Sequence, residues 1–92
     1  MTQDQAQTYA LTALTWLVGQ EDILGVFLGA SGASAQDLRE RASDPQFHGA
    51  VLDFILMDDA WVIACCEAMD LDPSLMKPAR MVLPGGQDVN WT

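Results

Sequence analysis

The chain has 92 residues, half of them apolar, and its four basic and thirteen acidic side chains give a net charge of −9. A chain of this length forms one domain with a single modest core. The negative charge argues against direct binding to nucleic acid or to anionic membranes, because both attract clustered Lys and Arg. Intrinsic disorder is excluded for most of the chain by its high apolar content.

The sequence also bears on the compartment in which the protein works. The first residues lack the basic segment and apolar stretch of a signal peptide. No apolar run approaches the roughly 18 residues of a membrane span. The two cysteines, Cys65 and Cys66, are neighbours and do not provide the disulfide framework of a small secreted domain. We therefore expect a reduced, cytoplasmic protein.

The first half of the chain predicts three helices. The first spans residues 3–19, begins with the capping-box spacing of Thr2 and Gln5, and ends at Gly19. Its apolar spacing predicts a core stripe made of Ala10, Leu11, Leu14, Leu17 and Val18. The second helix begins at Glu21-Asp22, is closed by Gly29 and Gly32, and has a predicted buried face of Ile23, Leu24, Phe27 and Leu28. The third spans Ala35–Ala42 and is capped by Ser34 with Asp37.

The second half predicts three more helices. Asp44-Pro45 pairs an N-cap acceptor with a proline at the first helical position, and opens a fourth helix that runs to about residue 57. This helix is apolar over most of its circumference, so we expect it at the centre. Asp58-Asp59 begins a fifth helix, whose predicted inward side chains are Trp61, Val62, Cys65, Ala68 and Met69. Asp72-Pro73 opens a sixth, with a kink at Pro78 and with the apolar residues Leu75, Met76, Ala79 and Val82.

These elements predict an all-α fold, a compact bundle of five to six short helices. We expect one domain over residues 1–86 and a flexible C-terminal tail over 87–92 that carries Trp91. A shift of 37 residues lays the first three helices on the last three. The chain is therefore either two pseudo-repeated three-helix units or a plain six-helix bundle whose helices share a length.

Several motifs between residues 8 and 84 identify a family. They are Gly25-Val26-Phe27-Leu28, Gly32, Leu38-Arg39-Glu40-Arg41-Ala42, Pro45-Gln46-Phe47, Ala50-Val51-Leu52-Asp53-Phe54, Asp58-Asp59 and Leu71-Asp72-Pro73. In these motifs the chain resembles the domain of unknown function 3572, a family of small helical proteins found mainly in alphaproteobacteria. The shared motifs are capping and core motifs. The resemblance therefore implies a small, cytosolic, bacterial all-α domain and carries over no activity.

Chemistry-bearing residues are few. His48, the one histidine, lies at the edge of the apolar face of its helix, and the spacing provides no nucleophile or orienting carboxylate for it. We therefore interpret His48 as a residue packed at the edge of the core. Cys65 and Cys66 are expected to behave as small apolar side chains. A metal interpretation rests on the acidic groups Asp53, Asp58, Asp59, Glu67, Asp70 and Asp72. These show neither the spacing of an EF-hand nor that of a di-iron site, and we expect no catalytic residue, metal or cofactor.

Two features favour a protein partner. Tyr9 and Trp16 lie seven residues apart on the first helix, away from its predicted core stripe, and interfaces prefer such aromatic residues. Either a partner or the chain's own sixth helix or tail covers them. Gly25 and Gly29 share one face of the second helix, and each costs about 1 kcal/mol relative to alanine. Close approach of another helix explains this cost, and we favour a helix of the same chain over a partner.

The sequence therefore predicts a non-enzymatic helical interaction module of the bacterial cytosol. Its partner is an unknown protein or a second copy of itself, and the predicted contact residues are Tyr9, Trp16, Gly25 and Gly29. The alternative is a small metal-binding protein or enzyme that uses His48 with nearby carboxylates. This alternative requires a pocket that brings His48 and at least two carboxylates together.

Overall fold

The computed structural model describes residues 1–84, and within this range the chain is all-α, as predicted. Its helices are α1 (Gln3–Val18), α2 (Glu21–Ser31), α3 (Ala35–Arg41), α4 (Pro45–Leu56), α5 (Asp59–Met69) and α6 (Met76–Val82), with the short 3₁₀ helix η1 (Pro73–Leu75) before α6. The predicted tail with Trp91 lies outside the described residues.

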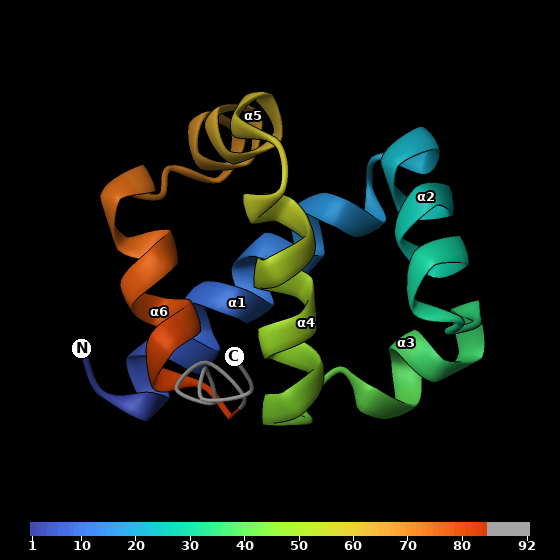
Figure 1. Ribbon diagram of the computed structural model, residues 1–92, viewed down its shortest axis with the longest axis horizontal. Helices are drawn as coiled ribbons and strands as arrows, with labels where there is room; N and C mark the ends of the chain where they lie inside the picture. Colours follow the sequence, from blue (N-terminus) through green and yellow to red (C-terminus); the bar gives the residue numbers. More distant parts are fainter. Residues whose placement is uncertain (85–92) are drawn as a thin grey trace, which may run out of the picture.

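Two central helices organise the molecule. α1 and α4 pack against each other, and α5 and α6 pack on both of them, as Figure 1 shows on the left and upper parts of the view. α2 and α3 form the right-hand side. The central position of α4 is confirmed, and α1 shares it. The outcome follows from apolar content, since seven of the twelve residues of α4 are buried.

Hydrogen bonds of capping side chains confirm the predicted starts of α1, α3, α4 and α5. Thr2 and Gln5 form a reciprocal capping box at α1, and Ser34 and Asp37 form a second one at α3. Three aspartates, at the starts of α4, α5 and η1, accept hydrogen bonds from backbone N–H groups, and they are Asp44, Asp58 and Asp72. Each such bond satisfies a donor that the first turn of a helix leaves without an acceptor.

A chain of aromatic rings joins three helices in the core. Phe27 of α2 meets the rings of Phe47 and Phe54 of α4 edge-on, with centroid distances of 5.8 and 5.1 Å. Phe54 in turn stacks on Trp61 of α5 at 4.8 Å. Edge-to-face and offset contacts of this kind add about 0.5–1.5 kcal/mol each beyond the area they bury. They fix α2 and α5 on either side of α4.

The predicted core stripe of α1 needs correction. Leu11 and Val18 are 45% and 50% exposed. Tyr9 and Trp16 are buried in their place, together with Ala6, Ala10, Ala13, Leu14 and Leu17. The physical reason is that three helices (α4, α5 and α6) pack on α1. The face of α1 that they cover is wider than one narrow stripe, and it points away from Leu11 and Val18.

The end of α2 and the beginning of α6 also differ from the prediction. α2 continues through Gly29 to Ser31, and Gly32 closes it in the left-handed conformation at φ 74°. The Asp72-Pro73 pair caps η1, and α6 begins only at Met76. Pro78 therefore lies in the first turn of α6, where its missing N–H removes no intrahelical hydrogen bond and no interior kink is required. Leu75, in η1, is 40% exposed.

The two halves of the chain pack differently. α6 packs closely against both α1 and α4, whereas its counterpart α3 has no comparably close packing with any helix in the described range. The central helices also differ in length, with sixteen residues in α1 and twelve in α4. The fold is thus a plain six-helix bundle rather than two equivalent three-helix units.

Within residues 1–84, no single helix has the length and apolar character needed to cross a membrane; α1 and α2 reach them only as a pair bent by 114°.

Candidate interaction site

Tyr9 and Trp16, the predicted partner contacts, lie inside the protein. Each side chain is 6% exposed. The Tyr9 hydroxyl donates a hydrogen bond to the Asp72 backbone carbonyl at 2.7 Å and lies 3.5 Å from the Cys66 sulfur. The expectation that Tyr9 and Trp16 contact a partner is therefore wrong. Both are buried within the protein itself, and Tyr9 is covered by α5 and by the segment leading into η1.

The surroundings of Tyr9 make it an inert structural group. Burial raises its pKa above the ordinary range, and the hydrogen bond to Cys66 acts in the same direction. Burial also raises the pKa of the Cys65 thiol to about 12, with a smaller contribution from Cys66. A buried thiol that keeps its proton is a poor nucleophile. This cluster therefore holds α1 to α5 and presents no reactive group.

Gly25 and Gly29 lie on an open face of α2. Both are exposed, and among residues 1–84 a Cβ atom built on either glycine would meet no atom beyond its own stretch of helix within 4 Å. Within residues 1–84, the structure therefore contradicts the preferred explanation, which is close approach of a helix of the same chain. α2 is anchored from its opposite side through Phe27, which leaves the Gly25–Gly29 face unpartnered within the described chain.

The structure reveals a second open surface, which we call the α1 stripe. It is formed by five exposed residues along the whole length of the helix, Asp4, Thr8, Leu11, Thr15 and Val18. Their spacing of four and three residues places them in one line, as in the contact seam of a coiled coil.

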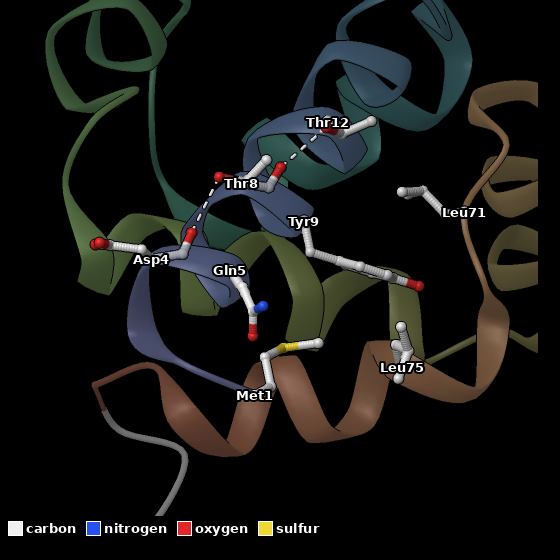
Figure 2. Close-up of a pocket in the computed structure, with 8 residues that line it drawn as sticks. All are labelled: Met1, Asp4, Gln5, Thr8, Tyr9, Thr12, Leu71 and Leu75. Atoms are coloured by element: carbon white, nitrogen blue, oxygen red, sulfur yellow. Dashed lines mark hydrogen bonds between the residues drawn. The ribbon is translucent and has the colours of Figure 1, made fainter.

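The threonines of α1 present methyl groups rather than unsatisfied hydroxyls. Thr8 donates its hydroxyl to the Asp4 carbonyl at 3.0 Å, and Thr15 bonds the Leu11 carbonyl at the same distance. Thr12, at the edge of the stripe, bonds the Thr8 carbonyl, and Figure 2 shows the bonds of Thr8 and Thr12 running along the helix. With the hydroxyl turned back onto the helix, each side chain can be covered without losing a hydrogen bond to water.

Hollows border the α1 stripe on both sides. One of about 590 Å³ lies toward η1 and includes Met1 and Leu75 among its walls (Figure 2). A second, of about 440 Å³, lies toward α2 and α3, where Leu24 and Leu38 form part of the wall. A third, of about 260 Å³, shares Thr8 with the first and Leu11 with the second. The three hollows therefore lie next to one another along α1, with Thr8 and Leu11 as shared walls, and together we call them the band.

The few positive charges of the protein are distributed unevenly around this band. Arg80 is paired with Asp53 and donates to the Pro84 carbonyl, and Arg41 lies 3.6 Å from Asp44. Arg39 and Lys77, by contrast, have no ion-pair partner among residues 1–84, and Arg39 lines the hollow next to Val18. The opposite end of the α1 stripe carries the exposed carboxylate of Asp4. The exposed residues of the middle are therefore apolar or carry internally bonded hydroxyls, while Asp4 lies at one end and Arg39 at the other.

The geometry around His48 does not meet the requirement of the enzyme or metal alternative. His48 is 3% exposed, and its Nε2 donates to the Ala42 carbonyl at the end of α3. It shares the small hollow with one carboxylate, Asp4, while Asp53 is engaged with Arg80. Within residues 1–84, no group of three metal-ligating side chains lies close enough to hold an ion. His48 is therefore a buried residue of α4 whose hydrogen bond to Ala42 joins the end of α3 to α4, in agreement with its interpretation as a packed residue.

The α1 stripe was missed because Leu11 and Val18 were assigned to the core. Its signal is nevertheless in the sequence, as the heptad-like spacing from Asp4 to Val18. Two apolar seams share the helix, and only the packing of α4, α5 and α6 shows which one is covered.

The fold and this surface define a small all-α protein with two crossing central helices. Residues 3–86 match the family described as "Protein of unknown function (DUF3572)", and the chain belongs to this family. The family resemblance of the sequence is thereby confirmed. No curated protein and no solved structure matches the chain.

Proposed function

We propose that the protein is a non-enzymatic, helical protein–protein interaction module of the bacterial cytosol, and that the α1 stripe is its docking face. The observation that carries the proposal is an open seam along the longest helix, bordered by apolar hollows. Peptide helices dock in such grooves through side chains spaced by three and four residues.

The chemistry of the seam supports docking in a second way. Leu11 and Val18 expose apolar surface, and removing it from water stabilises a complex by about 25 cal/mol per Å². The threonine hydroxyls are already bonded within α1, so a partner covers them without leaving buried donors unpaired. Burial of this seam by a partner therefore removes apolar surface from water and leaves no threonine hydroxyl without a hydrogen bond.

The Gly25–Gly29 face of α2 is the second contact face of the proposal. Each of these glycines keeps an exposed, helix-weakening position that no atom of the described chain explains. A partner helix that approaches α2 closely accounts for both positions. Alanine at either position would then weaken the complex while strengthening α2 itself.

Site-specific photo-crosslinking in cells tests the proposal. A photoreactive side chain at position 11 or 15 should give a discrete adduct of higher mass, identified by mass spectrometry. The matched control is position 63 on α5, where Ile63 is 54% exposed. Equal crosslinking at positions 11 and 63 would overturn the assignment of the docking face, because contact would then follow exposure alone.

A further inference from the structure

We propose that the occupant of the α1 stripe is a second copy of this chain, bound so that the two α1 helices run antiparallel about a two-fold axis beside Leu11. The inference rests on the proposed docking role of the α1 stripe and names its partner. A two-fold contact places the same surface on both sides, so the surface must be complementary to itself.

The positions of the stripe satisfy this requirement. Leu11 is its midpoint, with Asp4 seven residues before and Val18 seven residues after it. In an antiparallel pair, Leu11 meets its own symmetry copy, and Asp4 comes opposite Val18 of the second copy. The sixteen residues of α1 give a seam about 24 Å long at 1.5 Å per residue.

The pairing of Asp4 with Arg39 favours this orientation. Arg39 lines the same hollow as Val18 and is unpaired within residues 1–84. The antiparallel arrangement therefore brings Asp4 of each copy toward Arg39 of the other and forms the contact twice. A parallel arrangement would place the carboxylates together at one end and the arginines together at the other. Like-charge juxtaposition of this kind suppresses a wrong geometry.

The apolar middle of the seam provides the attraction between two copies that each carry a charge of −9. The hollow beside Leu11 is walled by Leu14, Leu38 and Ala42, and its volume of about 440 Å³ has room for the Leu11 side chain of the second copy. The overall repulsion opposes association at long range, so added salt, which screens it, should strengthen the dimer until the Asp4–Arg39 contacts are screened in turn.

Sedimentation equilibrium of the full chain tests the proposal. We expect the mean mass to rise with concentration from the chain mass of 10.0 kDa toward twice that value. Leu11→Arg should abolish the rise, because it places two like charges on the axis. The matched control is Ile63→Arg on α5, equally large and at a site 54% exposed, which should dimerise like the parent chain.

A charge exchange tests the orientation. Arg39→Asp and Asp4→Arg should each weaken dimerisation by on the order of tenfold, which corresponds to about 1.4 kcal/mol. The double variant Asp4→Arg/Arg39→Asp restores both pairs with reversed sign and should recover most of the lost affinity. Circular dichroism of each variant establishes that it remains folded.

Each result separates the alternatives. A chain that stays monomeric at all concentrations overturns the inference, as does a dimer that Leu11→Arg leaves intact. Failure of the double variant to recover affinity overturns the antiparallel arrangement. A monomer whose position 11 crosslinks to a different protein overturns the second copy as partner and leaves the proposed docking face standing.

Discussion

Tyr9 joins α1 by a hydrogen bond to the segment between α5 and η1. Its hydroxyl bonds the Asp72 carbonyl, sixty-three positions away, and lies beside Cys66. Tyr9→Phe keeps the ring in the core and removes the donor. We expect a loss of about 1 kcal/mol, the usual net value of such a hydrogen bond. Thermal unfolding should show the midpoint lowered by about 4–8 °C. An unchanged midpoint would mean that this hydrogen bond contributes nothing to stability.

Alkaline pH should unfold the protein through the same cluster. Burial raises the pKa of Tyr9 and raises that of Cys65 from 9.0 to about 12. The unfolded chain therefore releases these protons at lower pH than the folded one, and the stability present below pH 9 is lost as the pH rises toward 12. Tyr9 is the only tyrosine, so tyrosinate absorbance reports on it alone.

The measurement is a pH titration followed by both tyrosinate absorbance and circular dichroism. The two transitions should coincide, because Tyr9 ionises only when the cluster opens. Cys65→Ala should make the loss of stability with pH shallower, since one of the titrating groups is removed. Tyrosinate formation in a chain that keeps its full helical signal would contradict the burial of the hydroxyl.

The same substitution, glycine to alanine, should act oppositely at two positions. At Gly25 an added Cβ meets open space, so alanine should raise stability by about 1 kcal/mol. At Gly49 it would lie 2.8 Å from Arg80 Nη1 and 3.2 Å from the Pro84 carbonyl oxygen. We expect Gly49→Ala to displace Arg80 from Asp53 and Pro84, and to lower stability despite the better helix propensity.

Urea unfolding of Gly25→Ala, Gly49→Ala and the parent chain measures both signs. The control for Gly49 is the Arg80→Gln background, where the shorter side chain leaves room for the Cβ. Gly49→Ala should cost less in that background than in the parent chain. An equal cost in both would show that contact with the backbone at Pro84, rather than displacement of Arg80, sets the penalty.

At the scale of the element, helix starts follow from local chemistry. The Asp44 side chain accepts the Gln46 N–H at 3.0 Å, and Pro45 takes the first position of α4. Asp44→Ala should cost about 1 kcal/mol, the usual value of an N-cap. Asp59→Ala is the comparison, because Asp59 lies in the first turn of α5 and does not cap it. Thermal unfolding should show the smaller loss for Asp59→Ala; equal losses would contradict the capping role.

Helix faces were harder to predict than helix starts. A cap needs only residues two or three positions apart, such as Ser34 and Asp37, so the sequence contains the whole interaction. The buried face of α1 depends on helices that follow it much later in the chain. Leu11 and Val18 fit an apolar stripe by period alone. They are exposed because α4, α5 and α6 pack on α1 and the buried face contains Tyr9, Ala13 and Trp16 instead. The candidate site was missed for the same reason.

At the scale of the whole molecule, the negative charge is part of the architecture. Eight of the thirteen acidic residues occupy helix starts, where carboxylates complement the helix dipole, and they are Asp4, Glu21, Asp22, Asp37, Asp44, Asp58, Asp59 and Asp72. Hydrogen bonds from the Ser74 side chain and backbone lower the pKa of Asp72, which keeps this cap ionised. The stabilisation that this cap provides is present at neutral pH and is lost as the pH falls through its lowered pKa.

The sequence by itself determined the all-α class, the six helices, most of their first residues and the family, because capping and apolar spacing are local properties of the chain. Only the tertiary structure decided which face of α1 is buried, that the Gly25–Gly29 face is open, and that Arg39 stands unpaired beside an apolar band within residues 1–84. These outcomes depend on contacts between segments far apart in sequence, which compete for the same apolar surfaces and are settled only when the helices pack together.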